Sequence, residues 1–319
     1  MTASSPIIAV VTPVYNGERF LAETMDCVQA QTYPHVVHVV LDNCSTDGTA
    51  EIIKRYADAR VPVITGQNPE VLDMGSNWNA ALKLIPEDAE YFRILCADDL
   101  MTPDFCERMV ETAERHPDML VVGCKVSHRE EDTMDFGWEA DRETFPGKEA
   151  VRRYFDDSGV IIAHQTIMRR RILAMREVFF EPGMTTNDTD AVLDVLRHGA
   201  WGFVQANLGL TREHDDTDTS KTVRPMRMDL CEHLVLLDRH ARFGLGEAEG
   251  ERMLRTYRRY YVRKLMRWAV RGERDIFNRH LSALKRMGFK LTPAHFADAA
   301  IDWPLIRLNL RPAWTGRLA

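Results

Sequence analysis

Two adjacent carboxylates, Asp98 and Asp99, come directly after a short apolar run at residues 91–96. Such a run is typical of a buried strand, and α/β proteins bind their ligands just beyond the carboxyl ends of strands. Two carboxylates at that place can hold a divalent cation, and such a cation can neutralise a diphosphate. The pair could equally cap the helix that we expect after Pro103, so the rest of the chain has to decide between the two interpretations.

The part of the chain that leads to these acids alternates between strands and helices. Apolar runs predict strands at residues 7–11, 36–41, 61–65 and 91–96, and apolar residues at helical spacing predict helices within 21–28, 50–57 and 78–85. This order favours a doubly wound α/β sheet with right-handed crossovers. No G-x-G-x-x-G follows the first strand, and no G-x-x-x-x-G-K-[ST] loop occurs. A dehydrogenase-type dinucleotide fold is therefore disfavoured.

The pattern is looser in the rest of the chain. Residues 127–147 are polar and acidic, which indicates a surface excursion or a lid. Further short strands are expected at 160–163 and 202–204, with a helix from about Asp190 to Arg197. From Arg224 onward the pattern is mainly helical.

Composition describes an ordinary globular protein with an uneven charge distribution. The 319 residues are 45% hydrophobic and 28% charged, and the formal net charge is −7. From Arg224 to the end, however, 20 Lys and Arg stand against 10 Asp and Glu. A basic region of this kind can contact an anionic membrane surface, but a solvated helix face gives the same composition. Nucleic acid is not an expected partner.

Three features bear on where the protein works. No apolar stretch approaches the roughly 20 residues that span a bilayer. The first residues lack the basic region and apolar core of a secretory signal. The six cysteines show no C-x-x-C pair and no zinc-ligand spacing, as in a reducing compartment. We expect a cytosolic protein, and peripheral contact with the inner face of the membrane is an open alternative.

Five motifs occur in a fixed order along the first part of the chain. They are Thr12-Pro13-Val14-Tyr15-Asn16-Gly17, Gln31-Thr32-Tyr33-Pro34, Leu41-Asp42-Asn43-Cys44-Ser45-Thr46-Asp47-Gly48-Thr49, Trp78-Asn79-Ala80-Ala81-Leu82 and Leu95-Cys96-Ala97-Asp98-Asp99. This ordered set resembles the family 2 glycosyltransferases, inverting enzymes of the GT-A fold. The resemblance is strong over residues 7–125, thinner over 160–220 and says little about the rest.

The resemblance implies an architecture for the whole chain. It predicts an α/β fold of GT-A type, in which a mixed, mostly parallel, Rossmann-like sheet is flanked by helices. A GT-A catalytic domain would then occupy residues 1–223, with nucleotide-sugar binding in 1–125 and the acceptor and catalytic part in 126–223. A basic helical C-terminal region would occupy 224–319.

The resemblance also implies a binding site for a nucleotide-sugar donor. In this family the backbone at the end of the first strand and an acid after the second strand hold the nucleoside, which transfers to Pro13, Tyr15 and Asp42. Asn79 belongs to the same predicted site. A carboxylate can accept the imide N–H of uracil, so a UDP-sugar is the favoured donor. The alternative for Asp42 is a turn-forming residue before a helix.

A divalent metal, Mn²⁺ or Mg²⁺, is the cofactor that the resemblance implies. Asp99 would bind the metal itself, and Asp98 would contact the ribose or a water on the metal. The match to the D-x-D motif is imperfect, because Cys96 stands where the longer motif has its first acid. His214 lies in a segment that resembles the family's R-x-H motif and would be a second ligand or touch the diphosphate.

Direct displacement at the sugar requires a base for the acceptor hydroxyl, which is a poor nucleophile at neutral pH. The family carries this base in an E-D pair at a helix start. Here Asp188 matches the Asp, while Asn187 replaces the Glu. Asp190 is a rival base, and the alternative is a helix start that is rich in acids because of its dipole. His164 lies where members of the family often contact donor or acceptor.

The function that follows is transfer of a sugar to a glycan or lipid-linked acceptor in cell-surface polysaccharide or lipopolysaccharide assembly. Two alternatives stay open at this point. One is a catalytically silent nucleotide-sugar-binding or scaffolding protein, as the replacements at Cys96 and Asn187 suggest. The other is a nucleotidyltransferase, which is disfavoured because residues 14–19 hold one Gly and one Arg where a triphosphate loop needs more.

The basic C-terminal region has its own alternatives. Its apolar stripe at helical spacing consists of Leu254, Tyr257, Tyr261, Leu265 and Trp268. The stripe could rest on a membrane that carries a lipid-linked acceptor, or pack on the catalytic domain or on a second subunit of a homodimer.

Overall fold

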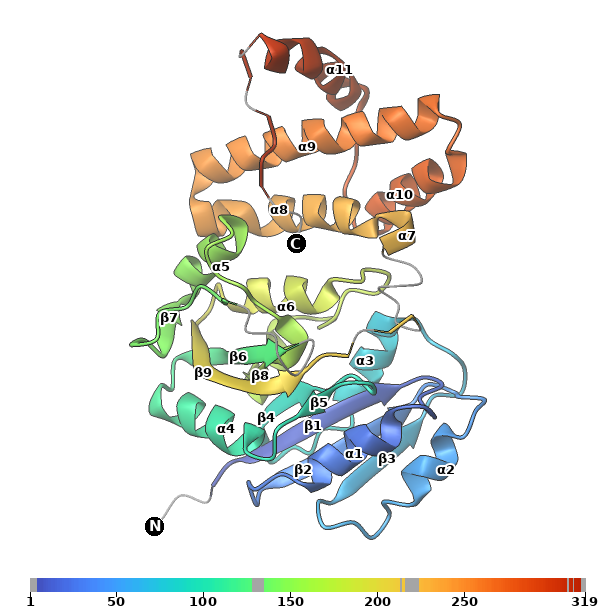
Figure 1. The fold of residues 1–319 in the computed structure, drawn as a ribbon, viewed down its shortest axis with the longest axis vertical. Helices are drawn as coiled ribbons and strands as arrows, with labels where there is room; N and C mark the ends of the chain where they lie inside the picture. Colours follow the sequence, from blue (N-terminus) through green and yellow to red (C-terminus); the bar gives the residue numbers. More distant parts are fainter. Residues whose placement is uncertain are drawn as a thin grey trace. The chain divides into compact units, whose positions relative to one another are not determined.

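The computed structural model describes residues 5–127, 135–212, 214–215, 224–308, 310–311 and 313–316. The chain forms two compact units (Figure 1). The first comprises Met1–Gly147, Val160–Pro182 and Asn187–Glu213, and the second comprises Lys148–Gly159, Gly183–Thr186 and His214–Ala319. The predicted division into functional regions at residue 223 stays a prediction.

The first unit is built on a mixed sheet, which has nine strands within the described residues. The strands are β1 (Ile7–Val14), β2 (Val36–Asp42), β3 (Val63–Gln67), β4 (Ala89–Ile94), β5 (Leu100–Met101), β6 (Met119–Ser127), β7 (Thr144–Pro146), β8 (Ile167–Arg169) and β9 (Ala200–Leu210). Their order is β3-β2-β1-β4-β8-β6-β9-β5, and β7 pairs with β9. Strands β1 to β4 pair in parallel, and β8 is antiparallel to both of its neighbours.

Helices follow the parallel strands as the sequence predicts. They are α1 (Leu21–Gln29), α2 (Thr49–Lys54), α3 (Met74–Leu82), α4 (Phe105–Arg115) and α6 (Asn187–Val195), with short 3₁₀ turns η1 (Ala163–Gln165) and η2 (Arg170–Met175). Helices α1 and α2 pack on β1 and β2 through one apolar cluster, which consists of Val14, Leu21, Met25, Val40, Ile52 and Ile53. The middle of β1 is fully buried, as expected for a parallel strand with both faces covered.

Register brings the carboxyl ends of three strands to the same edge of the sheet. Val14 at the end of β1 lies opposite Asp42 at the end of β2, and Val11 lies opposite Ile94 at the end of β4. Between β1 and β4 the strand order changes direction, because the chain runs outward from β1 to β3 and then returns beside β1. Such a switch point is where open α/β sheets bind ligands.

The expected surface excursion at 127–147 is met in part. Residues 128–134 fall outside the described part of the chain, and in the part that follows Asp135, Gly137 and Asp141 are exposed. Phe136 and Trp138 are buried, however, and β7 joins the sheet. The ring of Trp138 lies 5.6 Å from that of Trp201, so aromatic contacts anchor this polar segment.

The strand that we expected at 160–163 is not formed. These residues lead into η1, and the strand comes later, as β8. The apolar run predicts burial correctly, since Ile161 and Ala163 are buried. Burial alone, however, does not distinguish a strand from a turn. The expected strand at 202–204 lies within the longer β9, and the expected helix from Asp190 begins earlier, as α6.

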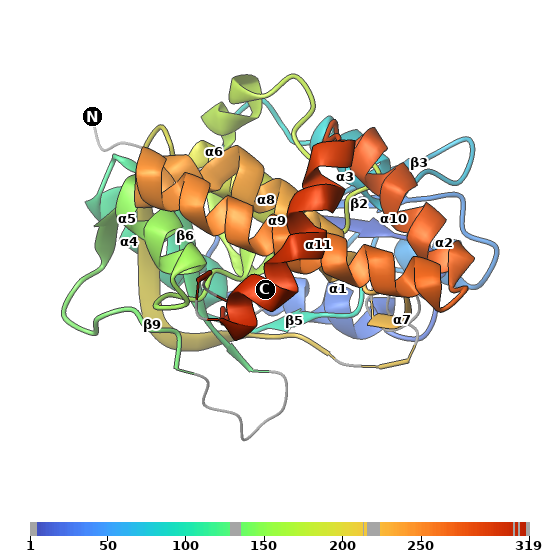
Figure 2. The same cartoon turned by 90° about the horizontal axis from the view of Figure 1, so that it is seen from above.

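The second unit is helical in its described part. Helix α5 (Gly147–Phe155) begins in the first unit and continues into the second, which also holds α7 (Arg224–Met226), α8 (Met228–Leu245), α9 (Glu247–Val270), α10 (Arg274–Arg286) and α11 (Pro293–Arg307). Helices α8 and α9 run side by side, and α11 packs on α9 (Figure 2). No helix within the described residues has the length and apolar character needed to cross a membrane.

The aromatic stripe of the C-terminal region packs inside this second unit. Leu254, Tyr257, Tyr261 and Leu265 are all buried there. The hydroxyl of Tyr257 donates to the carbonyl of Leu230 on α8 at 2.8 Å. Burial within the unit therefore accounts for the stripe.

Gly147 gives a test of close packing in the first unit. A Cβ at this position would lie 1.8 Å from the carbonyl oxygen of Leu196 and 2.3 Å from that of Gly199. We expect Gly147→Ala to lower the free energy of unfolding by about 2 kcal/mol or more, because these are backbone atoms that cannot rotate away. The measurement is the urea midpoint at unchanged slope.

The matched control is Gly48→Ala in the same unit. Its Cβ would meet only the end of the flexible Glu18 side chain, and its φ of −71° suits any residue. We expect a loss below about 1 kcal/mol. Equal losses in the two variants would contradict the packing.

Candidate active site

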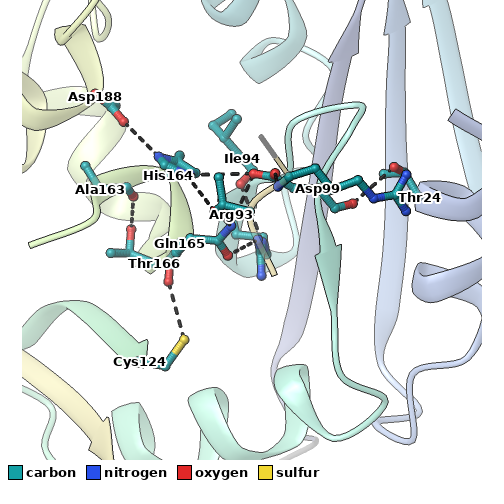
Figure 3. Close-up of polar contacts among 12 residues, drawn as sticks. Thr24, Arg93, Ile94, Asp99, Cys124, Ala163, His164, Gln165, Thr166 and Asp188 are labelled. Atoms are coloured by element: carbon teal, nitrogen blue, oxygen red, sulfur yellow. Dashed lines mark hydrogen bonds and ion pairs between the residues drawn. The ribbon is translucent and has the colours of Figure 1, made fainter. Parts of the chain in front are cut away.

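Asp99 is a buried carboxylate at the edge where β1, β2 and β4 end (Figure 3). Its side chain accepts a hydrogen bond from the backbone N–H of Arg212 at 3.1 Å and one from the amide of Gln165 at 3.2 Å. Its own carbonyl accepts a bond from the hydroxyl of Thr24 on α1. The acid is thus held from three separate parts of the first unit, and it is only 3% exposed.

The charge of Asp99 is costly in this environment. Burial raises the pKa of its carboxyl to about 6, and the neighbouring charge of Asp98 adds to the rise. His164, the N–H of Arg212 and the buried Arg93 act in the opposite direction without cancelling it. A carboxylate with a raised pKa gains most from a cation that binds it.

His164 connects Asp99 with a second acid from a distant part of the sequence. Its Nε2 lies 3.7 Å from Asp99 Oδ2, and its Nδ1 lies 3.5 Å from Asp188 Oδ2, as Figure 3 shows. Burial lowers the pKa of this imidazole, but the hydrogen bond with Asp188 and the charge of Asp99 outweigh it, so the net pKa is raised. The structure therefore brings both acids to one imidazole.

Gln165 and Arg93 support this arrangement, and neither was among the predicted site residues. Gln165 donates to Asp99 and accepts a bond from the guanidinium of Arg93 at 3.0 Å. Arg93 is fully buried and lies over the ring of Phe105, 4.1 Å from its centroid. The one available signal was a charged residue inside the apolar run at 91–96, which is unusual for a buried strand.

Cys96, Asp98 and Asp99 form a group that could hold a metal ion. Among the residues that the structure describes, one ligand atom from each of the three lies within 4.8 Å of the others. The two carboxylates fit the predicted Mg²⁺ or Mn²⁺, because these hard ions take oxygen ligands, whereas the thiol is a soft donor that they do not prefer. Burial and the nearby carboxylates raise the pKa of the Cys96 thiol well above its ordinary value. His214 belongs to the second unit, and its role as a ligand stays a prediction.

Asp42 ends β2 beside these acids. One carboxylate oxygen accepts the N–H of Ser45 at 2.9 Å, and the other accepts the amide of Gln67 at 3.0 Å. Pro13 is buried one residue before the end of β1, whereas the Tyr15 ring is exposed just beyond it. The predicted nucleoside residues therefore share one edge of the sheet, where an exposed ring and a fixed carboxylate stand close in register.

Asn79 has different contacts from those expected of a donor ligand. Its amide donates to the carbonyl of Phe180 at 2.7 Å and accepts the N–H of the same residue at 2.9 Å. The side chain thus anchors a backbone segment of the first unit. Its predicted place in the nucleotide-sugar site stays a prediction.

The two candidate bases differ in their surroundings. Asp188 accepts the N–H of Thr189 at 2.7 Å through one oxygen and faces His164 through the other. Asp190 is 1% exposed and is paired with Arg176 at 2.7 Å. An acid in a buried ion pair is a poor proton acceptor, so the geometry favours Asp188.

Comparison with known proteins identifies relatives of this chain. Residues 9–175, just over half of the chain, match the family described as glycosyl transferase family 2. The putative teichuronic acid biosynthesis glycosyltransferase TuaG of Bacillus subtilis is 32% identical over 115 residues, which cover 35% of this chain and 43% of that protein. The putative glycosyltransferase EpsE of the same organism is 33% identical over 123 residues, 38% of this chain and 43% of that protein. The match thus spans less than half of these relatives.

Solved structures share the fold over nearly the whole chain. TarS of S. aureus, residues 1–349 in complex with UDP-GlcNAc, has a TM-score of 0.59 at 16% identity, covering 90% of this chain and 93% of that one. The mannosyltransferase PcManGT from Pyrobaculum calidifontis, in complex with GDP-Man and Mn²⁺, has a TM-score of 0.60 at 16% identity, covering 96% and 81%. At identities this low the structural likeness shows the fold alone. It confirms the predicted GT-A-type architecture.

The raised pKa of Asp99 predicts how stability changes with pH. Between about pH 4, where an unfolded Asp titrates, and pH 6 the folded state holds more protons, so its free energy of unfolding falls as pH rises. Asp99→Asn removes this loss. We expect the variant to gain roughly 2–3 kcal/mol relative to the wild type between pH 4 and 7.5. Urea denaturation in EDTA across this range measures it, and a difference independent of pH would contradict the assignment.

Proposed function

Since the chain belongs to glycosyl transferase family 2, we propose that it moves a sugar from a nucleoside-diphosphate sugar to an acceptor hydroxyl with inversion at the anomeric carbon. One observation carries the proposal: His164 contacts both Asp99, the predicted metal ligand, and Asp188, the predicted base. The groups that we propose to bind the donor and to accept the proton thus lie near one imidazole of the first unit, which supports the proposal. Family membership leaves nucleotidyl transfer without support.

In the proposed reaction the acceptor oxygen attacks the anomeric carbon while the bond from that carbon to the diphosphate oxygen breaks. Asp188 accepts the proton of the hydroxyl as the new bond forms. One oxygen of the Asp188 carboxylate accepts the N–H of Thr189, and the other oxygen faces His164. The negative charge that develops on the leaving diphosphate has to be stabilised, because Asp98, Asp99 and Asp188 in this region are themselves acidic.

A divalent cation, Mn²⁺ or Mg²⁺, would supply the positive charge that the leaving group needs. Asp99 would hold it, with Asp98 near enough to share the coordination sphere. PcManGT has been solved in complex with Mn²⁺, which supports the same cofactor class here.

The donor that we propose is a UDP-sugar. TarS has been solved with UDP-GlcNAc and PcManGT with GDP-Man, so the fold accommodates either base. Asp42 can accept the imide N–H of uracil here, because each of its oxygens has one partner and a carboxylate has room for more. TuaG is named for teichuronic acid biosynthesis, and we propose that this chain likewise acts on a glycan or lipid-linked acceptor in cell-surface polysaccharide assembly.

The first test concerns the base. We expect Asp188→Asn to lower the rate of transfer by at least about 100-fold while the dissociation constant for the donor changes little, because the amide cannot accept the proton. Release of nucleoside diphosphate in the presence of acceptor measures the rate, and calorimetry measures binding.

Asp190→Asn is the matched comparison on the same helix turn. It breaks the buried pair with Arg176, so we expect a loss of thermal stability of several degrees and a smaller loss of rate. Full activity of Asp188→Asn together with inactivity of folded Asp190→Asn would move the base to Asp190. Absence of turnover in the wild type with every donor would favour a silent binding protein.

The second test concerns the nucleoside. We expect UDP to bind more tightly than GDP in the presence of Mn²⁺, and Asp42→Ala to weaken UDP by about 10- to 100-fold, as expected for a hydrogen bond to a charged group. Asp58→Asn, an exposed acid in the same unit, is the control and should bind as the wild type does. Equal affinity of Asp42→Ala and the wild type for UDP would remove Asp42 from the site.

A further inference from the structure

Glu232 on α8 is a buried acid that binds a short segment of backbone. It is 1% exposed. Its Oε1 accepts the N–H of Thr185 at 2.9 Å, and its Oε2 accepts the hydroxyl of Thr185 at 2.6 Å and the N–H of Thr186 at 2.9 Å. Glu232 and Gly183–Thr186 belong to the same compact unit. A single side chain therefore fixes two successive residues.

If Glu232 served only to stabilise the fold, an apolar side chain at this position would be favoured over a buried carboxylate. Among the described residues, no Lys or Arg forms an ion pair with Glu232, so the carboxylate relies on N–H and O–H groups. Burial raises the pKa of Glu232 although the bonds from Thr185 and Thr186 oppose the rise. Removing a carboxylate from water without a counter-charge costs free energy that an apolar side chain would not cost. Positions that break this rule are often functional ones.

The segment that Glu232 holds leads directly into the helix that carries the proposed base. Thr186 is followed by Asn187, the first residue of α6, and then by Asp188. The backbone of the preceding residues sets where a helix starts and in which direction its first side chains point. An error of about 1 Å in the position of a catalytic group can cost about 100-fold in rate.

We propose that Glu232 is a positioning residue for the transfer reaction: by holding Thr185 and Thr186 it fixes the start of α6 and so the direction of the Asp188 carboxylate. The inference rests on the proposed function, because the role of Asp188 as base is part of that function. Glu232 lies outside the residues that match the family, 9–175.

The test separates positioning from general stabilisation. We expect Glu232→Ala to lower kcat by about 10- to 100-fold while the donor KM stays within about threefold, because the donor is held by other residues. Glu232→Gln keeps one acceptor oxygen, so its kcat should lie between those of Glu232→Ala and the wild type. It also keeps the test open if Glu232→Ala fails to fold.

Tyr257→Phe is the matched control. It removes the buried hydrogen bond between α9 and the carbonyl of Leu230 on α8, and it leaves the bonds of Glu232 with Thr185 and Thr186 in place. It should therefore lower the thermal midpoint and leave kcat unchanged. If it lowers kcat as much as Glu232→Gln does at a similar loss of stability, the positioning role is overturned.

A double-mutant cycle shows whether Glu232 acts through Asp188. In the Asp188→Asn background, Glu232→Gln should cause no further loss of the residual rate, because there is no base left to position. A full additional loss in that background, or wild-type kcat in Glu232→Gln alone, would overturn the inference. The proposed function fails by a different result, namely no release of nucleoside diphosphate by the wild type or unchanged turnover by Asp188→Asn alone.

Discussion

The negative charge of Asp99, buried where the parallel strands end, is the constraint around which the first unit is arranged. Water is excluded from it, so its stabilisation comes from the N–H of Arg212, the amide of Gln165 and the imidazole of His164. The first comes from the segment that follows β9, and the other two are neighbouring residues of η1. Moving either segment would remove partners from a buried charge, which is among the most costly errors in a fold.

The same constraint explains why the site calls for a cation. Asp98 and Asp99 are adjacent, and Asp188 reaches the same imidazole as Asp99. Arg93 is the nearby fixed positive charge, but it lies behind Gln165 and is fully buried. Acids therefore outnumber the bases that face the site, and a divalent ion would relieve their repulsion while giving a diphosphate something to bind.

The sequence predicts those parts of this account that are local. Asp42 is the last residue of β2, and Asp98 and Asp99 follow shortly after β4. The periodicity and the order of the elements are therefore enough to place these acids at one edge of the sheet. Contacts between distant segments could not be predicted in this way. Gln165, Arg93 and Glu232 look like ordinary polar residues until folding brings their partners to them. The same holds for 135–147, because the contact of Trp138 with Trp201 and the pairing of β7 with β9 decide which of these residues are buried.

Anomalous X-ray scattering from crystals grown with Mn²⁺ and UDP tests the central claim most directly, because it locates the ion without relying on activity. The account predicts one strong manganese peak bonded to the Asp99 carboxylate, with the diphosphate on its other side and the uracil near Asp42. A manganese peak elsewhere in the molecule, or UDP bound away from the ends of β1, β2 and β4, would contradict it.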